Sequence, residues 1–371
     1  MASERDFQSR RWLALALLCV SQFMVVLDAA IMNVALPTIG ASLDIPQANI
    51  AWVVNAYVLT FGGFLLLGGR LADLVGRRLV FMSGLVLFAL ASLAGGFAQT
   101  EGVLIAARAV QGLGAALLSP AALSIVTTIF KDGAERNKAL GVWGAVAGSG
   151  GAVGVLLGGV LTEYLGWEWV LWVNVPIGIG AALLAPTLVR ESRADSATRH
   201  FDLAGAVSVT AGLSLLVYAF LEAPDAGWGS GQTIGLLAVA AGLIGAFVAI
   251  ELRSASPLVP FRIFRKRTLT GANIVGILTG ASMFSMFFFI SLYMQNVLGY
   301  SAIKAGLSYL PLSAGIIIAA GVASQLVTRV GFKPVLAFGM ALVSGALLWF
   351  TQISADGGYV SDILGPSLVV A

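Results

Sequence analysis

The sequence has little of what an enzyme or a disulfide-stabilised domain would need. It contains a single cysteine, Cys19, and a single histidine, His200, so neither a disulfide framework nor a cysteine–histidine metal cluster is available. We find no nucleophile–base pair and no phosphate-binding glycine loop. We therefore expect no enzyme activity, no bound metal and no cofactor, and we interpret His200 as a solvated loop residue rather than a proton relay.

Charge is also scarce, whereas long apolar runs are abundant. Of the 371 residues, 11% are charged and 58% are hydrophobic, and the mean hydropathy is +0.94. A soluble domain of this composition would have too little polar surface, which predicts an all-α polytopic membrane protein. Because a span needs about 20 apolar residues, we expect spans at 12–36, 49–69, 79–99, 103–129, 138–162, 169–189, 203–221, 233–252, 269–293, 303–326 and 334–353. A twelfth begins near residue 363, so we expect that the chain stops inside it and that the last spans are missing.

Basic residues are unevenly divided between alternate loops. If the N-terminus is inside, the loops on the outer side carry one basic residue, Lys304, whereas acidic residues divide about evenly between the two sides. Lys and Arg report membrane orientation and acidic residues do not. The sequence therefore predicts a cytoplasmic N-terminus, and it attributes the net charge of +3 to topology rather than to nucleic-acid binding.

Two ionisable residues of opposite sign fall inside predicted spans. Asp28 lies in span one and Arg108 in span four, at similar depth by residue count, and a charge at that depth costs roughly 2.5–3.5 kcal/mol. Gln22 and Asn33 widen a polar sector around Asp28, and Gln111 follows Arg108 by about one helical turn. These five residues predict a buried polar site that moves something across the bilayer. The alternative for Arg108 is that its side chain snorkels to the outer surface.

The loop after span two carries a cluster of charges between glycines. A carboxylate here can pair with the neighbouring arginines, and the glycines allow tight turns. Such a latch would suit a gate on the cytoplasmic side, although ordinary positive-inside residues around a turn would look similar. The predicted gate residues are Gly69, Arg70, Asp73, Gly76, Arg77 and Arg78.

Span five is rich in glycine. Gly150, Gly154 and Gly158 recur every four residues and so line one helix face, where another helix could approach closely. Gly159 adjoins this face. Glycine also permits bending, so the sequence leaves open whether these residues serve as a hinge or only as a packing surface.

A weak internal repeat suggests two bundles. The segment "GRLADLVGRRLVF" (69–81) after span two resembles "SQLVTRVGFKPVL" (324–336) after span ten, with Thr328 in the place of Asp73. Repeated halves are common in transporters with alternating access. The predicted domains are an N-terminal six-helix bundle at 1–189, a linker and an extra transmembrane hairpin at 190–252, and an incomplete C-terminal bundle at 253–371.

Together these segments resemble the major facilitator superfamily, and specifically its fourteen-span drug:proton antiporter branch of the EmrB/QacA type. The similarity covers the first half densely, and the second half matches mainly in layout. The motifs that carry it are "LDAAIMNVALP" (27–37), "GRLADLVGRR" (69–78), "ARAVQGLGAA" (107–116), "GAVGVLLGGVL" (151–161) and "WVNVPIG" (172–178).

The resemblance implies a major facilitator fold, with two six-helix bundles around a central cavity and an extra pair of spans between them. It implies a monomeric exporter in the bacterial inner membrane that exchanges hydrophobic or amphipathic compounds for protons. Asp28 would take up a proton or contact substrate, and Arg108 would take part in proton coupling. The loop residues would form the gate, and the span-five glycines the hinge.

Two departures from the family pattern affect this expectation. Val155 stands where the span-five motif has proline, which implies less bending, and Leu74 stands where the loop motif has a basic residue. We do not expect transport by this chain unaided if its last spans are missing. The alternatives are a dedicated exporter of one metabolite or self-made antibiotic on the same fold and, in another class, a membrane sensor or channel.

Overall fold

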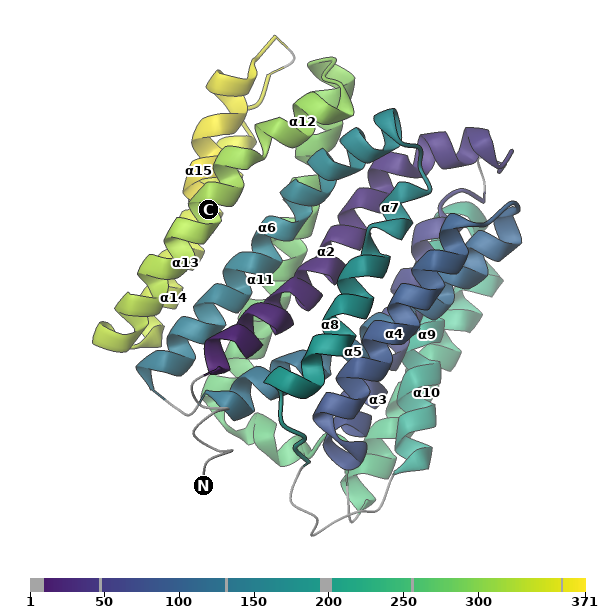
Figure 1. Ribbon diagram of the computed structural model, residues 1–371, viewed down its shortest axis with the longest axis vertical. Coiled ribbons are helices and arrows are strands. Elements are labelled where there is room, and N and C mark those ends of the chain that lie inside the picture. The colour runs from purple at the N-terminus through teal and green to yellow at the C-terminus, as the bar shows by residue number, and fades with distance from the viewer. Residues whose placement is uncertain (1–9, 47–48, 131–132, 194–201, 255–256, 355) are drawn as a thin grey trace. The chain divides into compact units, whose positions relative to one another are not determined.

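Among the residues that it describes, the computed structural model has helices joined by turns and irregular segments, and no strands (Figure 1). In this described part of the chain, eleven helices are long and apolar enough to cross a membrane, which confirms the prediction of an all-α polytopic membrane protein. His200 lies outside the described residues. Those residues are 10–46, 49–130, 133–193, 202–254, 257–354 and 356–371.

The helices follow the predicted spans in order. Those up to residue 188 are α2 (Arg11–Ser42), α3 (Trp52–Val75), α4 (Arg77–Gly96), α5 (Glu101–Ile129), α6 (Ala134–Tyr164), α7 (Trp169–Trp172) and α8 (Asn174–Leu188). Those beyond it are α9 (Leu203–Ala226), α10 (Gly231–Arg253), η2 (Phe261–Arg265), α11 (Arg267–Leu292), η3 (Tyr293–Val297), α12 (Ala302–Ser308), α13 (Leu310–Val330), α14 (Phe332–Phe350), η4 (Tyr359–Leu364) and α15 (Gly365–Val370).

Some helix ends differ from the prediction. The first span was expected to end at residue 36, but α2 continues through Pro37 to Ser42, since a membrane helix tolerates a proline when neighbouring groups satisfy the freed carbonyl. The fifth span was expected to begin at residue 138, but α6 begins at Ala134, which places Lys138 on the helix. Span ten is divided at Tyr309 into α12 and α13.

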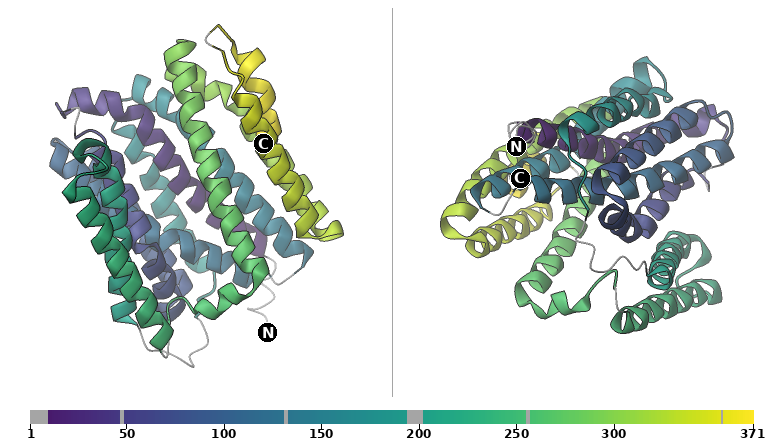
Figure 2. Two further views of the ribbon diagram at one scale, coloured as in Figure 1. Left: turned by 180° about the vertical axis from the view of Figure 1, so that it is seen from behind. Right: turned by 60° about the horizontal axis from the view of Figure 1, so that its bottom comes forward.

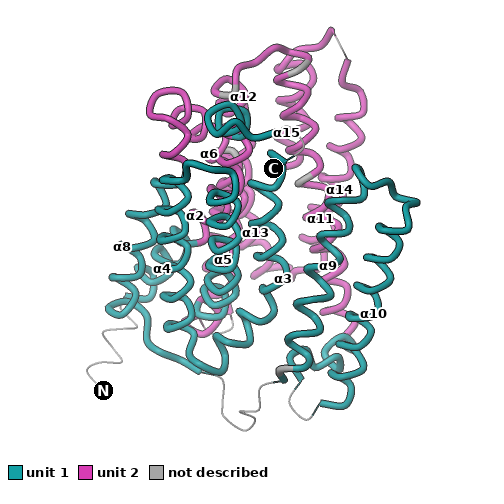
Figure 3. Tube along the Cα trace, turned by 90° about the vertical axis from the view of Figure 1, so that its right-hand side faces the viewer, with its two compact units in different colours: residues 1–21, 36–125, 171–265 teal, residues 22–35, 126–170, 266–371 magenta. Residues whose placement is uncertain are grey.

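The described chain separates into two compact units (Figure 3). Unit 1 comprises residues 1–21, 36–125 and 171–265, and unit 2 comprises residues 22–35, 126–170 and 266–371. This grouping reflects contacts and does not follow chain order, so the division at residues 190 and 253 stays a prediction.

In unit 1, α4 packs against α3 and α8, and α3 also packs against α9. The hairpin of α9 and α10 forms a pair of adjacent helices (Figure 2). Its helices begin where side chains cap them: Asp202 accepts a hydrogen bond of 2.7 Å from the Gly205 N–H, and Ser230 caps α10 through the Thr233 N–H. Such caps satisfy backbone donors that a helix start leaves open.

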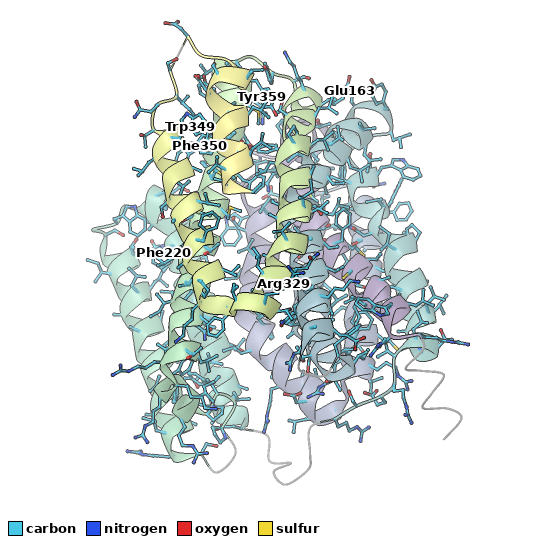
Figure 4. The ribbon with its side chains drawn as sticks, turned by 90° about the vertical axis from the view of Figure 1, so that its left-hand side faces the viewer. Glu163, Phe220, Arg329, Trp349, Phe350 and Tyr359 are labelled. Atoms are coloured by element: carbon cyan, nitrogen blue, oxygen red, sulfur yellow. The ribbon has the colours of Figure 1, made fainter. Side chains whose placement is uncertain are left out.

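In unit 2, α6 packs along α12 and α13. Arg329 marks the end of α13 that joins α14, and Trp349, Phe350 and Tyr359 lie toward the opposite end of the unit (Figure 4). A buried apolar cluster that includes Met286, Ile290, Tyr309, Leu312 and Ile363 joins α11, α13 and η4.

Candidate functional site

Arg108 is completely buried on α5 in unit 1. Its Nε donates a hydrogen bond of 3.0 Å to the backbone oxygen of Val53 on α3. Its guanidinium carbon lies 4.4 Å from the ring centroid of Tyr57, a cation–π geometry. The side chain is therefore held inside the protein, which excludes the alternative that it snorkels to the surface.

A chain of hydrogen bonds fixes the next turn of α5. One terminal nitrogen of Arg108 donates to Oε1 of Gln111. The amide nitrogen of Gln111 donates to Oγ of Ser92 on α4 at 2.8 Å, and Ser92 donates to the Phe88 carbonyl at 2.8 Å. Because Oε1 must accept, the orientation of the Gln111 amide is set. The site is thus built from α3, α4 and α5.

Glycines on α5 bring these helices close enough for the site to form. A Cβ at Gly112 would collide with Thr60 Oγ1 and the Tyr57 carbonyl on α3, and a Cβ at Gly114 would lie 2.7 Å from the Phe88 nitrogen on α4. Thr60 also donates a hydrogen bond of 2.8 Å to the Ala109 carbonyl. The spacing of "ARAVQGLGAA" therefore places the arginine near points where α3 and α4 closely approach the backbone of α5.

Asp28 is completely buried on α2, in the segment that belongs to unit 2. Of the other residues predicted to share its polar sector, Gln22 is partly buried, with Oε1 enclosed and without a hydrogen-bond partner among the described residues. Asn33 is exposed and donates to the Ala29 carbonyl of its own helix at 2.8 Å. Arg108 belongs to the other unit, so its pairing with Asp28 stays a prediction.

The glycine face of α6 packs against this segment of α2. A Cβ at Gly150 would lie 2.8 Å from Val26 Cγ1, and one at Gly154 would lie 2.6 Å from the Ala30 Cβ. At Gly158 it would lie 2.9 Å from Ile31 Cγ1. Close helix approach along this face is therefore confirmed, and α6 runs unbroken through Val155. A hinge role for these glycines stays a prediction.

Gly159 lies on another side of α6, where an added Cβ would be 2.9 Å from Ile303 Cγ1 on α12. It contributes to packing within unit 2, separate from the face toward α2.

The predicted gate loop is a tight turn between α3 and α4. Asp73 forms an ion pair of 3.0 Å with Arg77. Gly76 has a φ of +138°, which L side chains rarely adopt. Gly69, expected in a turn, instead lies within α3, because the helix continues to Val75. Arg70 was expected beside the carboxylate, but its Nε is buried without a hydrogen-bond partner in the described structure.

Glu191, which follows α8, contacts the predicted gate loop, and sequence reasoning missed it. Its carboxylate accepts hydrogen bonds of 3.1 and 3.0 Å from the backbone N–H groups of Arg78 and Leu79. It also lies 3.9 Å from the Arg78 guanidinium. A Cβ at Gly76 would come within 2.7 Å of this carboxylate. Glu191 therefore caps the start of α4 and ties it to the end of α8.

Glu251 is a second carboxylate without a sequence-based assignment. It is 4% exposed on α10 and accepts hydrogen bonds of 3.1 and 3.0 Å from the N–H groups of Leu258 and Val259. It fixes the segment that leaves the hairpin. The sequence signal was a lone acid in the last turn of an apolar helix, a pattern that also fits an ordinary solvated helix end.

A groove of about 610 Å³ lies between α11 and α14 in unit 2. Met286, Phe289 and Phe350 contribute to its apolar walls, and Tyr293 also lines it. The Tyr293 hydroxyl donates to Asp362 at 3.3 Å. Hydrogen bonds hold the pKa of Asp362 below its usual value. The Ser361 hydroxyl has the largest effect, and the Ser354 N–H has the next largest. Apolar and aromatic walls with few polar groups suit a small amphipathic ligand.

Known proteins resemble this chain over nearly its whole length. The sequence profile described as the Major Facilitator Superfamily matches residues 18–370. The cephamycin export protein CmcT of Amycolatopsis lactamdurans is 43% identical, with 96% of this chain and 74% of that protein covered. The puromycin resistance protein pur8 of Streptomyces alboniger is 40% identical, with 97% and 72% covered.

Two further similarities extend this picture. The multidrug transporter protein MdtP of Bacillus subtilis (strain 168) is 33% identical, with 95% of this chain and 65% of that protein covered. A solved structure of the proton:xylose symporter XylE bound to 6-bromo-6-deoxy-D-glucose superposes with a TM-score of 0.61 at 16% identity. It covers 98% of this chain and 79% of that chain, and at this identity the likeness speaks for the fold alone.

Proposed function

The chain belongs to the Major Facilitator Superfamily, and on that premise we propose that it exports hydrophobic or amphipathic drugs and antibiotics in exchange for protons. The observation that carries the proposal is the identity of 33–43% to relatives named for cephamycin export and multidrug transport. The family consists of transporters, which argues against an enzyme. The apolar, methionine-containing groove of unit 2 supports amphipathic substrates, because flexible thioethers adapt to varied shapes.

Asp28 is the residue that we propose to carry the proton. It is a carboxylate with no exposed surface on a membrane-spanning helix, and ionisable groups at such positions commonly mark proton or substrate pathways. If a substrate and a proton compete for one carboxylate, they cannot occupy it together. The substrate would then leave the cell as the proton enters, which is antiport. No cofactor is needed, because the proton gradient supplies the energy.

Arg108 would serve as the fixed cation of the coupling step. Its contacts with Val53, Tyr57 and Gln111 restrain the guanidinium. A fixed positive charge favours the ionised form of a carboxylate that comes near it. A change of access that brings Asp28 toward or away from Arg108 would therefore release or take up a proton.

The turn between α3 and α4 would act as the cytoplasmic gate. The Asp73–Arg77 pair braces the turn within one segment, whereas Glu191 connects it to the end of α8. Ion pairs of this kind have low net stability at a wet surface, which suits contacts that break and re-form in each transport cycle.

We also propose that the chain belongs to the fourteen-span branch, as a monomer in the bacterial inner membrane with its N-terminus in the cytoplasm. The hairpin of α9 and α10, two span-length helices between the sixth and ninth spans, supports this placement. The excess of basic residues in alternate loops supports the orientation.

The proposal is tested by Asp28→Asn in the full-length protein reconstituted in vesicles. The variant should fold and insert, because the amide has nearly the same shape, but it should lose efflux driven by a pH gradient. Asp44→Asn is the matched control, since Asp44 is exposed beyond α2 with a φ of +53°, which Asn tolerates. Unchanged gradient-driven efflux by Asp28→Asn would refute the role of this carboxylate.

A dedicated exporter of one antibiotic is the second candidate. The names of the relatives for cephamycin export and puromycin resistance each specify a single compound. Competition in the same vesicles separates the two functions. Chemically unrelated amphipathic compounds should inhibit efflux of a reporter dye if the protein is a multidrug exporter, and one compound class alone should do so if it is dedicated.

A further inference from the structure

A second groove of unit 2, with a volume of about 600 Å³, runs between α6 and α13. Its walls include Val142 and Val146 from α6 and Ile317 from α13. Toward one end it is lined by Lys138 and Arg329, one from each helix. Among the described residues that line it, none is acidic. The groove therefore combines apolar walls with a cationic end.

The two basic residues lie at the same end of their helices. Lys138 lies in the second turn of α6, and Arg329 lies in the last turn of α13, where Figure 4 shows it beside the turn to α14. By the predicted orientation this end faces the cytoplasm. Residues this close to the end of a membrane helix lie at the level of lipid headgroups.

In the sequence repeat Arg329 occupies the position of Leu74, and the residue before it is not acidic. In the first copy Asp73 pairs with Arg77 at 3.0 Å. In the second copy Thr328 replaces the aspartate and accepts a hydrogen bond of 3.2 Å from Asn137 on α6. Arg329 is exposed, and it has no carboxylate within ion-pair distance in the described part of the chain. The second copy therefore has a basic residue beside Thr328, where the first copy has Leu74 beside an acid.

We infer that this groove binds an anionic phospholipid of the cytoplasmic leaflet. The phosphodiester lies between Lys138 and Arg329, whose charged donors match its oxygens. An acyl chain follows the groove along Val142, Val146 and Ile317, which removes apolar surface from water. The cytoplasmic leaflet is the anionic one, so this end of the groove faces the source of the ligand. A lipid bound here joins α6 to α13 at their cytoplasmic ends.

Native mass spectrometry of the purified full chain in detergent tests the inference, with phosphatidylglycerol as the probe and phosphatidylcholine as the neutral comparison. Arg329→Gln should weaken the first phosphatidylglycerol by about fivefold, the effect of one basic residue near a lipid surface. Gly321→Leu should weaken it at least as much with both charges intact. Gly321 lines the groove, and an added Cβ meets nothing within 4 Å, so the larger side chain fills the groove without disturbing helix packing.

Lys333→Gln is the matched control. Lys333 is an exposed basic residue in the first turn of α14, near Arg329 in the sequence, and it does not line the groove. Its loss should change the affinity less than twofold.

Three outcomes would overturn the inference. Equal weakening by Lys333→Gln would indicate diffuse surface attraction, and equal binding of phosphatidylcholine would show that the phosphodiester charge is not recognised. Displacement of the lipid by inorganic phosphate or glycerol phosphate would assign the groove to a soluble anion. Each measurement is of binding, so it is independent of whether the protein exports drugs.

Discussion

At the scale of single residues, the buried charge of Arg108 depends on neighbours that satisfy its donors. A buried cation without partners is strongly unfavourable. Here the guanidinium contacts three groups: the Val53 carbonyl of α3, the Gln111 side-chain amide of α5 and the ring face of Tyr57. Gln111 has a double role, because it accepts from Arg108 while its own amide group donates to Ser92. The orientation of Gln111 thus depends on α4.

We predict that Gln111→Leu destabilises the protein by about 1–3 kcal/mol, the penalty for a buried donor left without its acceptor. Ser92→Ala should also cost about 1–3 kcal/mol, since it removes the acceptor of the buried Gln111 amide and the hydrogen bond to the Phe88 carbonyl. Thermal unfolding of the purified protein in detergent measures both. Gln111→Glu is the control, because it keeps an acceptor for Arg108 and should be less harmful than leucine. A leucine variant as stable as the unaltered protein would show that Gln111 does not hold the arginine.

The sequence could predict part of this site and not the rest. Asp28 and Arg108 were recognisable because a charge in an apolar run is conspicuous, and Gln111 because it follows one turn after the arginine. Ser92 and Glu191 were not. A lone serine in a span and an acid in a basic loop are ordinary in sequence, and their importance arises from contacts with helices far along the chain.

At the scale of elements, glycines on two different sides of α6 allow neighbouring helices to pack closely against it. One face lies against α2 through Gly150, Gly154 and Gly158, whereas Gly159 faces α12. The four-residue spacing predicted one close contact, which the structure confirms. It could not predict the second, because glycines outside a regular repeat carry no periodic signal. The ends of the spans also could not be predicted from the sequence, because hydropathy does not show where a helix ends at the membrane interface.

We predict that Gly154→Ala destabilises the protein by about 1–3 kcal/mol, the usual effect of overpacking. The added Cβ would lie 2.6 Å from the Ala30 Cβ and 3.0 Å from the Leu27 carbonyl oxygen, so α2 and α6 must separate. Gly151→Ala is the matched control on the same helix, because its Cβ would meet nothing within 4 Å. Its stability should equal or exceed that of the unaltered protein, since alanine favours helix by about 1 kcal/mol. Thermal unfolding in detergent compares the two, and equal midpoints would contradict the packing interpretation.

At the scale of the whole molecule, the amino-acid composition was more informative about the fold class than any single motif. The scarcity of charge predicted a helical membrane protein, and the family motifs predicted the major facilitator fold, which the comparisons support. Domain boundaries could not be tested in the same way, because helices distant in sequence group together in each unit. Orientation is likewise a property of the entire chain, since it sums many weak preferences of Lys and Arg.

We predict that Lys304 faces the outside of the cell and Lys333 the cytoplasm. Both are exposed on helices of unit 2, and the chain contains one cysteine, Cys19, which is 4% exposed. Cys19→Ala therefore provides a background for single-cysteine variants with little loss of surface or packing. In intact cells a membrane-impermeant maleimide should label Lys304→Cys and leave Lys333→Cys unlabelled, and inside-out vesicles should reverse the pattern. The opposite pattern would invert the orientation, which would place the loop between α3 and α4 outside and remove the basis for a cytoplasmic gate.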